Sequence, residues 1–166
     1  QRICDTEIDN RVPWARKQLQ SIAQNYNRAT YLKFYIDELH DILSRPWHRI
    51  AELDVTLCER ICYWLGASVQ FERSSRLRLE GDRSERLVAL CQEFGTDHYL
   101  TGASALNYLD VELFKRNGIN VEFQDYHPVR YEQLHGAFVP YLSIIDLIVN
   151  CGPASLEVIR AGRKVV

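Results

Sequence analysis

The sequence predicts an α/β fold, with a small, mostly parallel sheet, crossover helices and a helical section at about residues 13–65. Apolar residues recur with helical spacing through that section. After Gly66, short strand-forming segments alternate with helical ones, which is the order of parallel strands joined by crossover helices. The 166 residues, of which 46% are hydrophobic, suffice for one domain with a buried core.

The helical section is expected to hold three helices. The first begins at Pro13, the second covers about 29–43 and the third covers about 47–65. Gly66 is placed to end the third helix, because glycine readily adopts the left-handed conformation of a helix C-terminus.

The remaining elements are shorter and mixed in type. Alternation and β-propensity predict strands at 2–8, 68–72, 98–101 and 119–123, and apolar spacing predicts helices at 84–94, 111–116, 144–150 and 155–160.

Composition excludes several classes of partner. The net charge of −2 gives no reason to expect a nucleic acid or a polybasic membrane contact. No apolar run approaches the ~20 residues of a membrane span, and no signal peptide opens the chain, so we expect a cytoplasmic protein. The five cysteines show neither CxxC pairs nor zinc-site spacing, so the sequence predicts no metal site and no cofactor.

Three loops follow the predicted strands of the α/β part, at 73–84, 101–108 and 126–135. Ligands of open parallel sheets collect beyond the carboxyl ends of the strands. A single site built from these three loops is therefore expected.

Four stretches resemble the WbqC-like protein family: DTEIDNRVPWARKQLQSIAQNY, RSSRLRLEGDRSERLVALC, DHYLTGASALNYLD and NVEFQDYHPVRYEQLHGAFVPYLSIIDLIVNCG. Together they cover nearly the whole chain as one domain. The family's N-terminal Gln-Pro-x-Tyr-x-Pro-Trp motif is absent, and the chain contains no methionine, so we expect it to be N-terminally incomplete. The resemblance implies a role in bacterial surface-polysaccharide (O-antigen) or related biosynthesis, with glycyl or acyl transfer as the suggested chemistry.

The first loop is rich in arginine and serine. Its phosphate-binding candidates are Arg73, Ser74, Ser75 and Arg83, accompanied by Arg76, Arg78 and Arg86. Guanidinium forks, hydroxyls and a helix N-terminus suit a phosphate or diphosphate. The alternative is a solvated turn, in which Asp82 and Glu85 form a capping box without any ligand.

The second loop offers small residues and hydroxyls. Thr101, Gly102 and Ser104 would let a ligand approach the backbone, with Tyr108 beside them. An ordinary strand-to-helix turn needs the same residue types. Asp110 has the position of a cap on the following helix.

The third loop supplies the candidate catalytic residues, His135 and His127, with Tyr126, Tyr131 and Gln133 as ligand-binding candidates. An unperturbed imidazole titrates near neutrality and suits a general base. We nominate His135 first; a hydrogen-bonded loop histidine is the structural alternative.

The helix after this loop is expected to be structural. Ser143 and Asp146 have the spacing of a capping box. Cys151 lies at a helix C-terminus, where the dipole disfavours a thiolate, so it is not expected to be a nucleophile.

Two functions lead from the sequence, ahead of a third, an adenylate-forming or nucleotidyl-transferring enzyme. The first is an acyl or aminoacyl transferase acting on an amino sugar carried by a nucleotide or lipid. The second is a non-catalytic nucleotide-sugar-binding or scaffolding module of the same pathway. Either could work as a homo-oligomer, since nothing in the residues fixes the oligomeric state.

Overall fold

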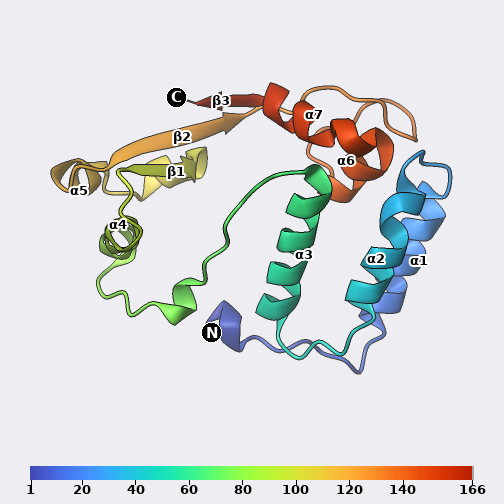
Figure 1. Cartoon of the computed structure of the whole chain (residues 1–166), viewed down its shortest axis with the longest axis horizontal. Helices are drawn as coiled ribbons and strands as arrows, with labels where there is room; N and C mark the ends of the chain where they lie inside the picture. The colour runs from blue at the N-terminus through green and yellow to red at the C-terminus, as the bar shows by residue number, and fades with distance from the viewer. Residues whose placement is uncertain (166) are drawn as a thin grey trace. The chain divides into compact units, whose positions relative to one another are not determined.

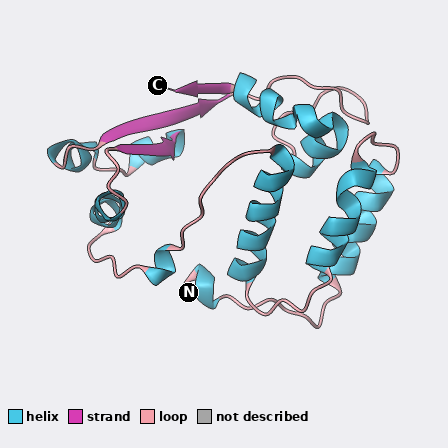
Figure 2. Ribbon diagram, in the orientation of Figure 1, coloured by secondary structure: helices cyan, strands magenta, loops and turns pink. Residues whose placement is uncertain are grey.

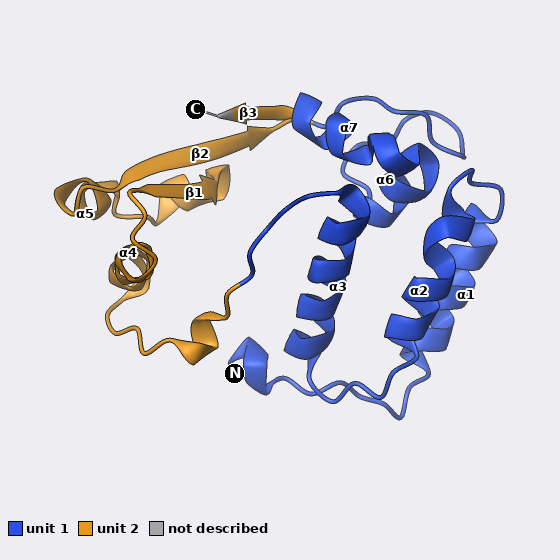
Figure 3. Ribbon diagram, viewed as in Figure 1, with its two compact units in different colours: residues 1–71, 128–161 blue, residues 72–127, 162–166 orange. Residues whose placement is uncertain are grey.

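The computed structural model describes residues 1–165, with the side chain of residue 165 left aside, and the chain forms two compact units (Figures 1 and 3). Unit 1 comprises residues 1–71 and 128–161, and unit 2 comprises residues 72–127 and 162–166. The polypeptide thus enters unit 2 after the third long helix and returns to unit 1 at Pro128.

Helices joined by loops make up the described part of unit 1 (Figure 2). Its helices are α1 (Trp14–Tyr26), α2 (Leu32–Leu43), α3 (Ile50–Leu65), α6 (Ile144–Cys151) and α7 (Ser155–Ala161), with short 3-10 turns at Ile3–Asp5 and Gly152–Ala154. The predicted helical section is therefore confirmed. Gly66 ends α3 with φ +68, as its position predicted.

The core of unit 1 forms where the faces of α2 and α3 meet. Leu39, Ile42, Leu43 and Leu53 are buried there, and Ile145 of α6 packs against them. This contact fixes the first turn of α6 against the helical layer, which places the residues of that turn for the site described below.

Unit 2 holds the sheet and two helices, α4 (Arg83–Glu93) and α5 (Val111–Arg116), with 3-10 turns at Ser74–Arg76 and Ala103–Asn107. Strand β1 (His98–Gly102) pairs in parallel with β2 (Asn120–Tyr126), and β2 pairs antiparallel with β3 (Arg163–Val165). Phe114 is fully buried at the centre of this unit, between the sheet residues Tyr99 and Phe123 and the buried Val88 of α4. The α/β class is confirmed.

Two of the predicted strands do not form. Residues 2–8 instead make the 3-10 turn Ile3–Asp5, because Arg2 Nε bonds to Asp5 Oδ2 at 2.8 Å and Thr6 N bonds to Ile3 O at 3.1 Å. A single bridge, Glu7 to Arg49, is the strand-like contact that remains.

Residues 68–72 are extended but pair with no strand. The 73–84 loop therefore does not leave the end of a strand. The sheet has instead a third member that the sequence did not predict, β3, which pairs with the last residues of β2.

None of the helices in residues 1–165 combines the length and the apolar character that crossing a membrane requires.

Candidate functional site

The predicted site residues divide between the two units. Tyr131, Gln133 and His135 belong to unit 1. The others belong to unit 2: Arg73, Ser74, Ser75, Arg83, Thr101, Gly102, Ser104, Tyr108, Tyr126 and His127. The third loop divides at Pro128, where the chain leaves the sheet unit for the helical one.

The centre of the unit 1 site is Asp146, in the first turn of α6 and only 4% exposed. Its Oδ2 accepts hydrogen bonds from Tyr131 Oη at 2.7 Å and from Gln133 Nε2 at 3.2 Å. Its Oδ1 accepts from Asn150 Nδ2 at 3.3 Å, and Tyr26 of α1 donates to the same carboxyl group. A buried carboxylate needs such donors, since desolvation without them would cost several kcal/mol.

Of the capping box expected on α6, the Ser143 cap forms but the Asp146 bond does not. Ser143 caps the helix, accepting from Ile145 N at 3.2 Å. The carboxylate of Asp146 is instead bonded to side chains from α1 and from the preceding loop. The spacing fits a cap, but Tyr131 and Gln133 bond to Oδ2 and Asn150, one turn further along α6, bonds to Oδ1.

Gln133 holds the loop that leads to α6. Its Oε1 accepts from Val139 N at 2.8 Å, and its Nε2 donates to Val139 O at 2.9 Å. The ring of Tyr131 meets Phe138 edge-on, with centroids 5.4 Å apart. Together these contacts close residues 131–139 into an ordered turn, so that the histidine within it has a defined position.

His135 is bonded through Nε2 to the carbonyl oxygen of Asn25, 2.8 Å away. A carbonyl only accepts, so Nε2 carries the hydrogen. In the neutral imidazole the remaining nitrogen, Nδ1, is then the basic one. The residue has the fixed tautomer that a general base requires.

His135 and Asp146 line one pocket of about 330 Å³, together with Ser21, Ile22, Asn25, Tyr26, Gln133, Val139 and Leu142. All of these residues belong to unit 1. The pocket therefore combines residues from α1, the 131–142 loop and α6.

Burial and the carboxylate together shift the pKa values around Asp146. The pKa of Tyr26 rises to about 12, as does that of Tyr131, through burial and the hydrogen bond to Asp146. Burial and the nearby charge of Asp146 also raise the pKa of the Cys151 thiol. A neutral thiol is a poor nucleophile, which agrees with the expectation for this cysteine.

In unit 2 the start of α4 is closed by its own residues. Asp82 accepts from Ser84 N at 2.9 Å and Glu85 N at 3.0 Å, and Glu85 Oε2 accepts from Asp82 N at 2.9 Å. The predicted capping box is confirmed. Two N–H groups of this helix start are therefore already bonded, so a phosphate near Arg83 would depend on the side chains.

The other unit 2 candidates lie on turns and at strand ends. Ser74 and Ser75 are exposed in their 3-10 turn, which Arg73 precedes.

Thr101 and Gly102 end β1, Ser104 lies in the turn after it, and Tyr108 follows that turn with 54% of its surface exposed. Asp110 caps α5 by accepting from Leu113 N at 3.0 Å, as its position predicted.

At the end of β2, His127 Nε2 lies 2.9 Å from Asp125 Oδ2, and both side chains are largely exposed. His127 N also donates to Gly162 O at 2.9 Å. A Cβ atom on Gly162 would lie 2.9 Å from the ring of Tyr126. The glycine thus allows β3 to approach the end of β2, where these two candidates lie.

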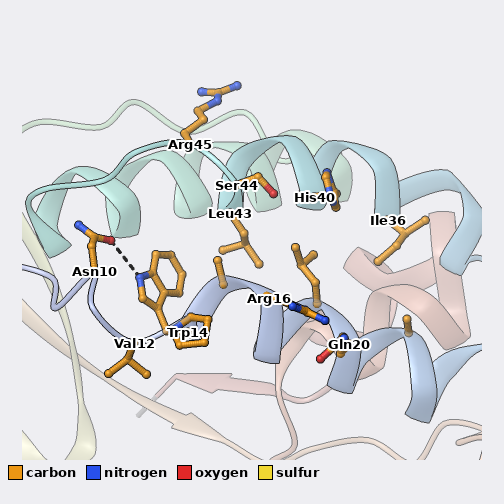
Figure 4. A pocket seen from close by; sticks show the side chains of 14 residues that line it. Asn10, Val12, Trp14, Arg16, Gln20, Ile36, His40, Leu43, Ser44 and Arg45 are labelled. Atoms are coloured by element: carbon orange, nitrogen blue, oxygen red, sulfur yellow. Dashed lines mark hydrogen bonds between the residues drawn. The ribbon is translucent and has the colours of Figure 1, made fainter.

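A larger groove of about 620 Å³ lies between α1 and α2 (Figure 4). Trp14, Leu19, Ile36 and Leu43 form much of its wall, and Trp14 Nε1 donates to Asn10 Oδ1 at 3.3 Å. It contains no predicted site residue. Among residues 1–165, no three His, Cys, Asp or Glu side chains are grouped so that they could hold a metal ion.

Sequence reasoning did not single out Asn25 or Tyr26, two polar residues of the pocket. Both lie in the last turn of α1. An amide and a phenol side by side at a helix end are the one local signal that could have indicated them.

Comparison with known proteins identifies the family of the chain and a relative. Residues 1–158 match the model of the WbqC-like protein family. The chain is 33% identical over 166 residues to "Uncharacterized protein Rv1507c" of Mycobacterium tuberculosis, a match that covers 99% of this chain and 71% of the relative. No solved structure gives a significant match.

Proposed function

Because the chain belongs to the WbqC-like protein family, with its role related to polysaccharide biosynthesis, we propose that it transfers a glycyl or other acyl group to an amino sugar. The sugar would be carried by a nucleotide or a lipid, in the O-antigen pathway or a related one. One observation carries this proposal: His135 lines a pocket and has its Nε2–H bonded to Asn25 O, which leaves Nδ1 as the basic nitrogen of the neutral ring.

In the proposed reaction the amine nitrogen of the sugar attacks the carbonyl carbon of an activated acyl donor, such as a thioester or an ester. A C–N bond forms and the bond from the carbonyl carbon to the leaving group breaks. His135 Nδ1 accepts the proton of the amine and returns it to the leaving group. No external oxidant or reductant is required, and the pocket supplies the base that the step needs.

Unit 2, taken by itself, is proposed to bind a phosphate group. The residues proposed for it are Arg73, Ser74, Ser75, Arg83, Thr101, Gly102, Ser104 and Tyr108. Guanidinium groups and hydroxyls are the donors that phosphate oxygens accept from. Tyr126 and His127 are assigned to the same ligand, and His127, oriented by Asp125, is the second candidate base.

A pair of histidine variants tests the proposal. In His135→Gln the side-chain amide can still donate to Asn25 O, but it cannot accept a proton. We expect the rate of transfer from activated glycine to a panel of amino-sugar nucleotides, followed by mass spectrometry, to fall at least a hundredfold. His48→Gln is the control, because His48 is an exposed histidine of the same unit. Equal activity of both variants would refute a catalytic His135.

One observation favours the alternative of a binding module. The polar groups around Asp146 are satisfied internally, as in a packing cluster. A module would bind nucleotide sugars without changing their mass. Binding retained in His135→Gln, with no transfer by the unmodified protein across the panel, would select this function.

A further inference from the structure

We propose that the pocket at His135 binds a protonated primary amine, and that this group belongs to the acceptor sugar of the proposed function. The inference rests on the proposed function for the identity of the carrier. The preference for an ammonium group comes from the pocket itself.

Three side chains of the pocket, Asn25, His135 and Tyr26, each keep an acceptor atom for a ligand. Both donor hydrogens of Asn25 are used, since Nδ2 bonds to Ser21 O at 2.8 Å and to Ser21 Oγ at 3.4 Å. Its Oδ1 is left to accept. His135 likewise uses its Nε2–H on a backbone carbonyl, which leaves Nδ1 to accept.

Tyr26 supplies the third acceptor. Its hydroxyl hydrogen is directed to Asp146, so that only the lone pairs of Oη remain for a ligand. A hydroxyl that donates to a carboxylate becomes a stronger acceptor, because hydrogen bonds in a chain polarise one another.

Asp146 supplies the negative charge that attracts an ammonium group, but its oxygens are not expected to bond to the ligand directly. Its oxygens already accept from Tyr131, Gln133, Asn150 and Tyr26. Of the described residues that line the pocket, none is a lysine or an arginine. A phosphate or carboxylate would therefore meet the buried negative charge of Asp146 without a Lys or Arg of the pocket to offset it.

An ammonium group has three donors and no acceptor. It matches three acceptors in a pocket of net negative character. An N-acetylated amine has one donor and no charge, and a hydroxyl has one donor, so neither can satisfy all three positions. The number of donors and the positive charge thus favour the free amine over its acetylated and hydroxyl counterparts.

Titration calorimetry at neutral pH tests the preference directly, with D-glucosamine, N-acetyl-D-glucosamine and D-glucose as probes. We expect D-glucosamine to bind at least tenfold more tightly than either of the others. Equal affinities for the three sugars would overturn the inference.

A matched pair of tyrosine variants locates the effect. Tyr26→Phe removes a pocket acceptor and should weaken D-glucosamine binding at least tenfold. Tyr131→Phe also removes a donor to Asp146, but Tyr131 does not line the pocket, so binding should change less than twofold. An equal loss in both variants would show that the effect passes through Asp146 and would overturn the inference.

Asn25→Ala provides a second measurement if Tyr26→Phe unfolds. Asn25 is an exposed residue, and its loss should weaken binding at least threefold; an unchanged affinity contradicts the proposal.

The proposed function and the amine preference can be refuted independently of each other. Selective amine binding without any transfer refutes the transferase alone, whereas transfer to a hydroxyl sugar without amine selectivity refutes the inference alone.

Discussion

Tyr131 donates its phenolic hydrogen to Oδ2 of Asp146 over 2.7 Å, and this bond joins the 131–142 loop to the first turn of α6. Tyr26 donates to the same carboxyl group from α1. One buried carboxylate thus joins three segments that are far apart in the sequence. The stability of unit 1 and the form of the pocket should both depend on it.

Asp146→Asn should destabilise the protein by about 2–4 kcal/mol, because an amide nitrogen would replace an oxygen that accepts hydrogen bonds in a buried site. At least one donor would then lose its acceptor without access to water. Urea denaturation measures the loss. Asp41→Asn is the control, since the Asp41 side chain is 77% exposed, and it should change stability by less than about 0.5 kcal/mol. Equal midpoints for the two variants would contradict a structural role for Asp146.

Tyr26 and Tyr131 should remain protonated until about pH 12, two units above the ordinary value of 10.0. Ultraviolet absorbance should therefore show these two among the late-ionising phenols of the nine tyrosines. Removing the carboxylate charge, as in Asp146→Asn, should move both titrations to lower pH.

The same shift predicts the direction of the alkaline stability change. A folded pKa raised above the unfolded one contributes stability that is fully present below about pH 10. This contribution disappears as the pH rises to about 12, because the unfolded chain releases its phenolic protons first. Unfolding midpoints that stay constant across this window, in Tyr131→Phe and in the unmodified protein alike, would contradict the assignment.

The features that the sequence predicted well depend on residues close together in the chain. Gly66 ends α3, Asp82 and Glu85 form their capping box, and Asp110 caps α5. Each of these is decided within about one helical turn, so spacing and residue type suffice.

The features that it did not predict depend on distant partners. The Ser-x-x-Asp spacing at Ser143 is compatible with an Asp146 carboxylate that caps the helix or with one that bonds to a distant side chain. The second holds, because Tyr131, 15 residues before Asp146, donates to this carboxylate. The alternation of apolar and polar residues at 2–8 gives a strand only where a neighbouring strand can pair with it through backbone hydrogen bonds. Here residues 3–5 form a 3-10 turn and a single bridge, Glu7 to Arg49, is made. The composition of the pocket likewise depends on α1 reaching a loop more than 100 residues later.

His98 should titrate above its ordinary pKa of 6.5, because its Nδ1 lies 2.7 Å from Asp97 Oδ1 and the charges of Asp97 and Glu122 favour the imidazolium form. The same hydrogen bond lowers the pKa of Asp97 below 3.8. An NMR titration of the histidine ring protons measures the first shift. In Asp97→Asn the midpoint should move to lower pH.

The direction of the pH effect differs for the two members of this pair. The raised pKa of His98 favours the folded state below pH 6.5, and this contribution is lost as the pH rises through the folded value. The lowered pKa of Asp97 favours it above pH 3.8, and this contribution is lost as the pH falls. A His98 midpoint that is unchanged by Asp97→Asn would refute the pairing.

Gly152→Ala should destabilise unit 1 by about 3 kcal/mol, because the backbone has φ +51 and ψ −126 and a Cβ would clash with the ring of Tyr31. Gly66→Ala is the matched control: φ is +68, but nothing lies within 4 Å, so only the conformational cost of about 1 kcal/mol applies. Thermal unfolding compares the two. Combining Gly152→Ala with Tyr31→Ala should recover the steric part of the loss, since the ring that the new methyl group meets is then absent. Strict additivity of those two changes would show that the cost is conformational alone.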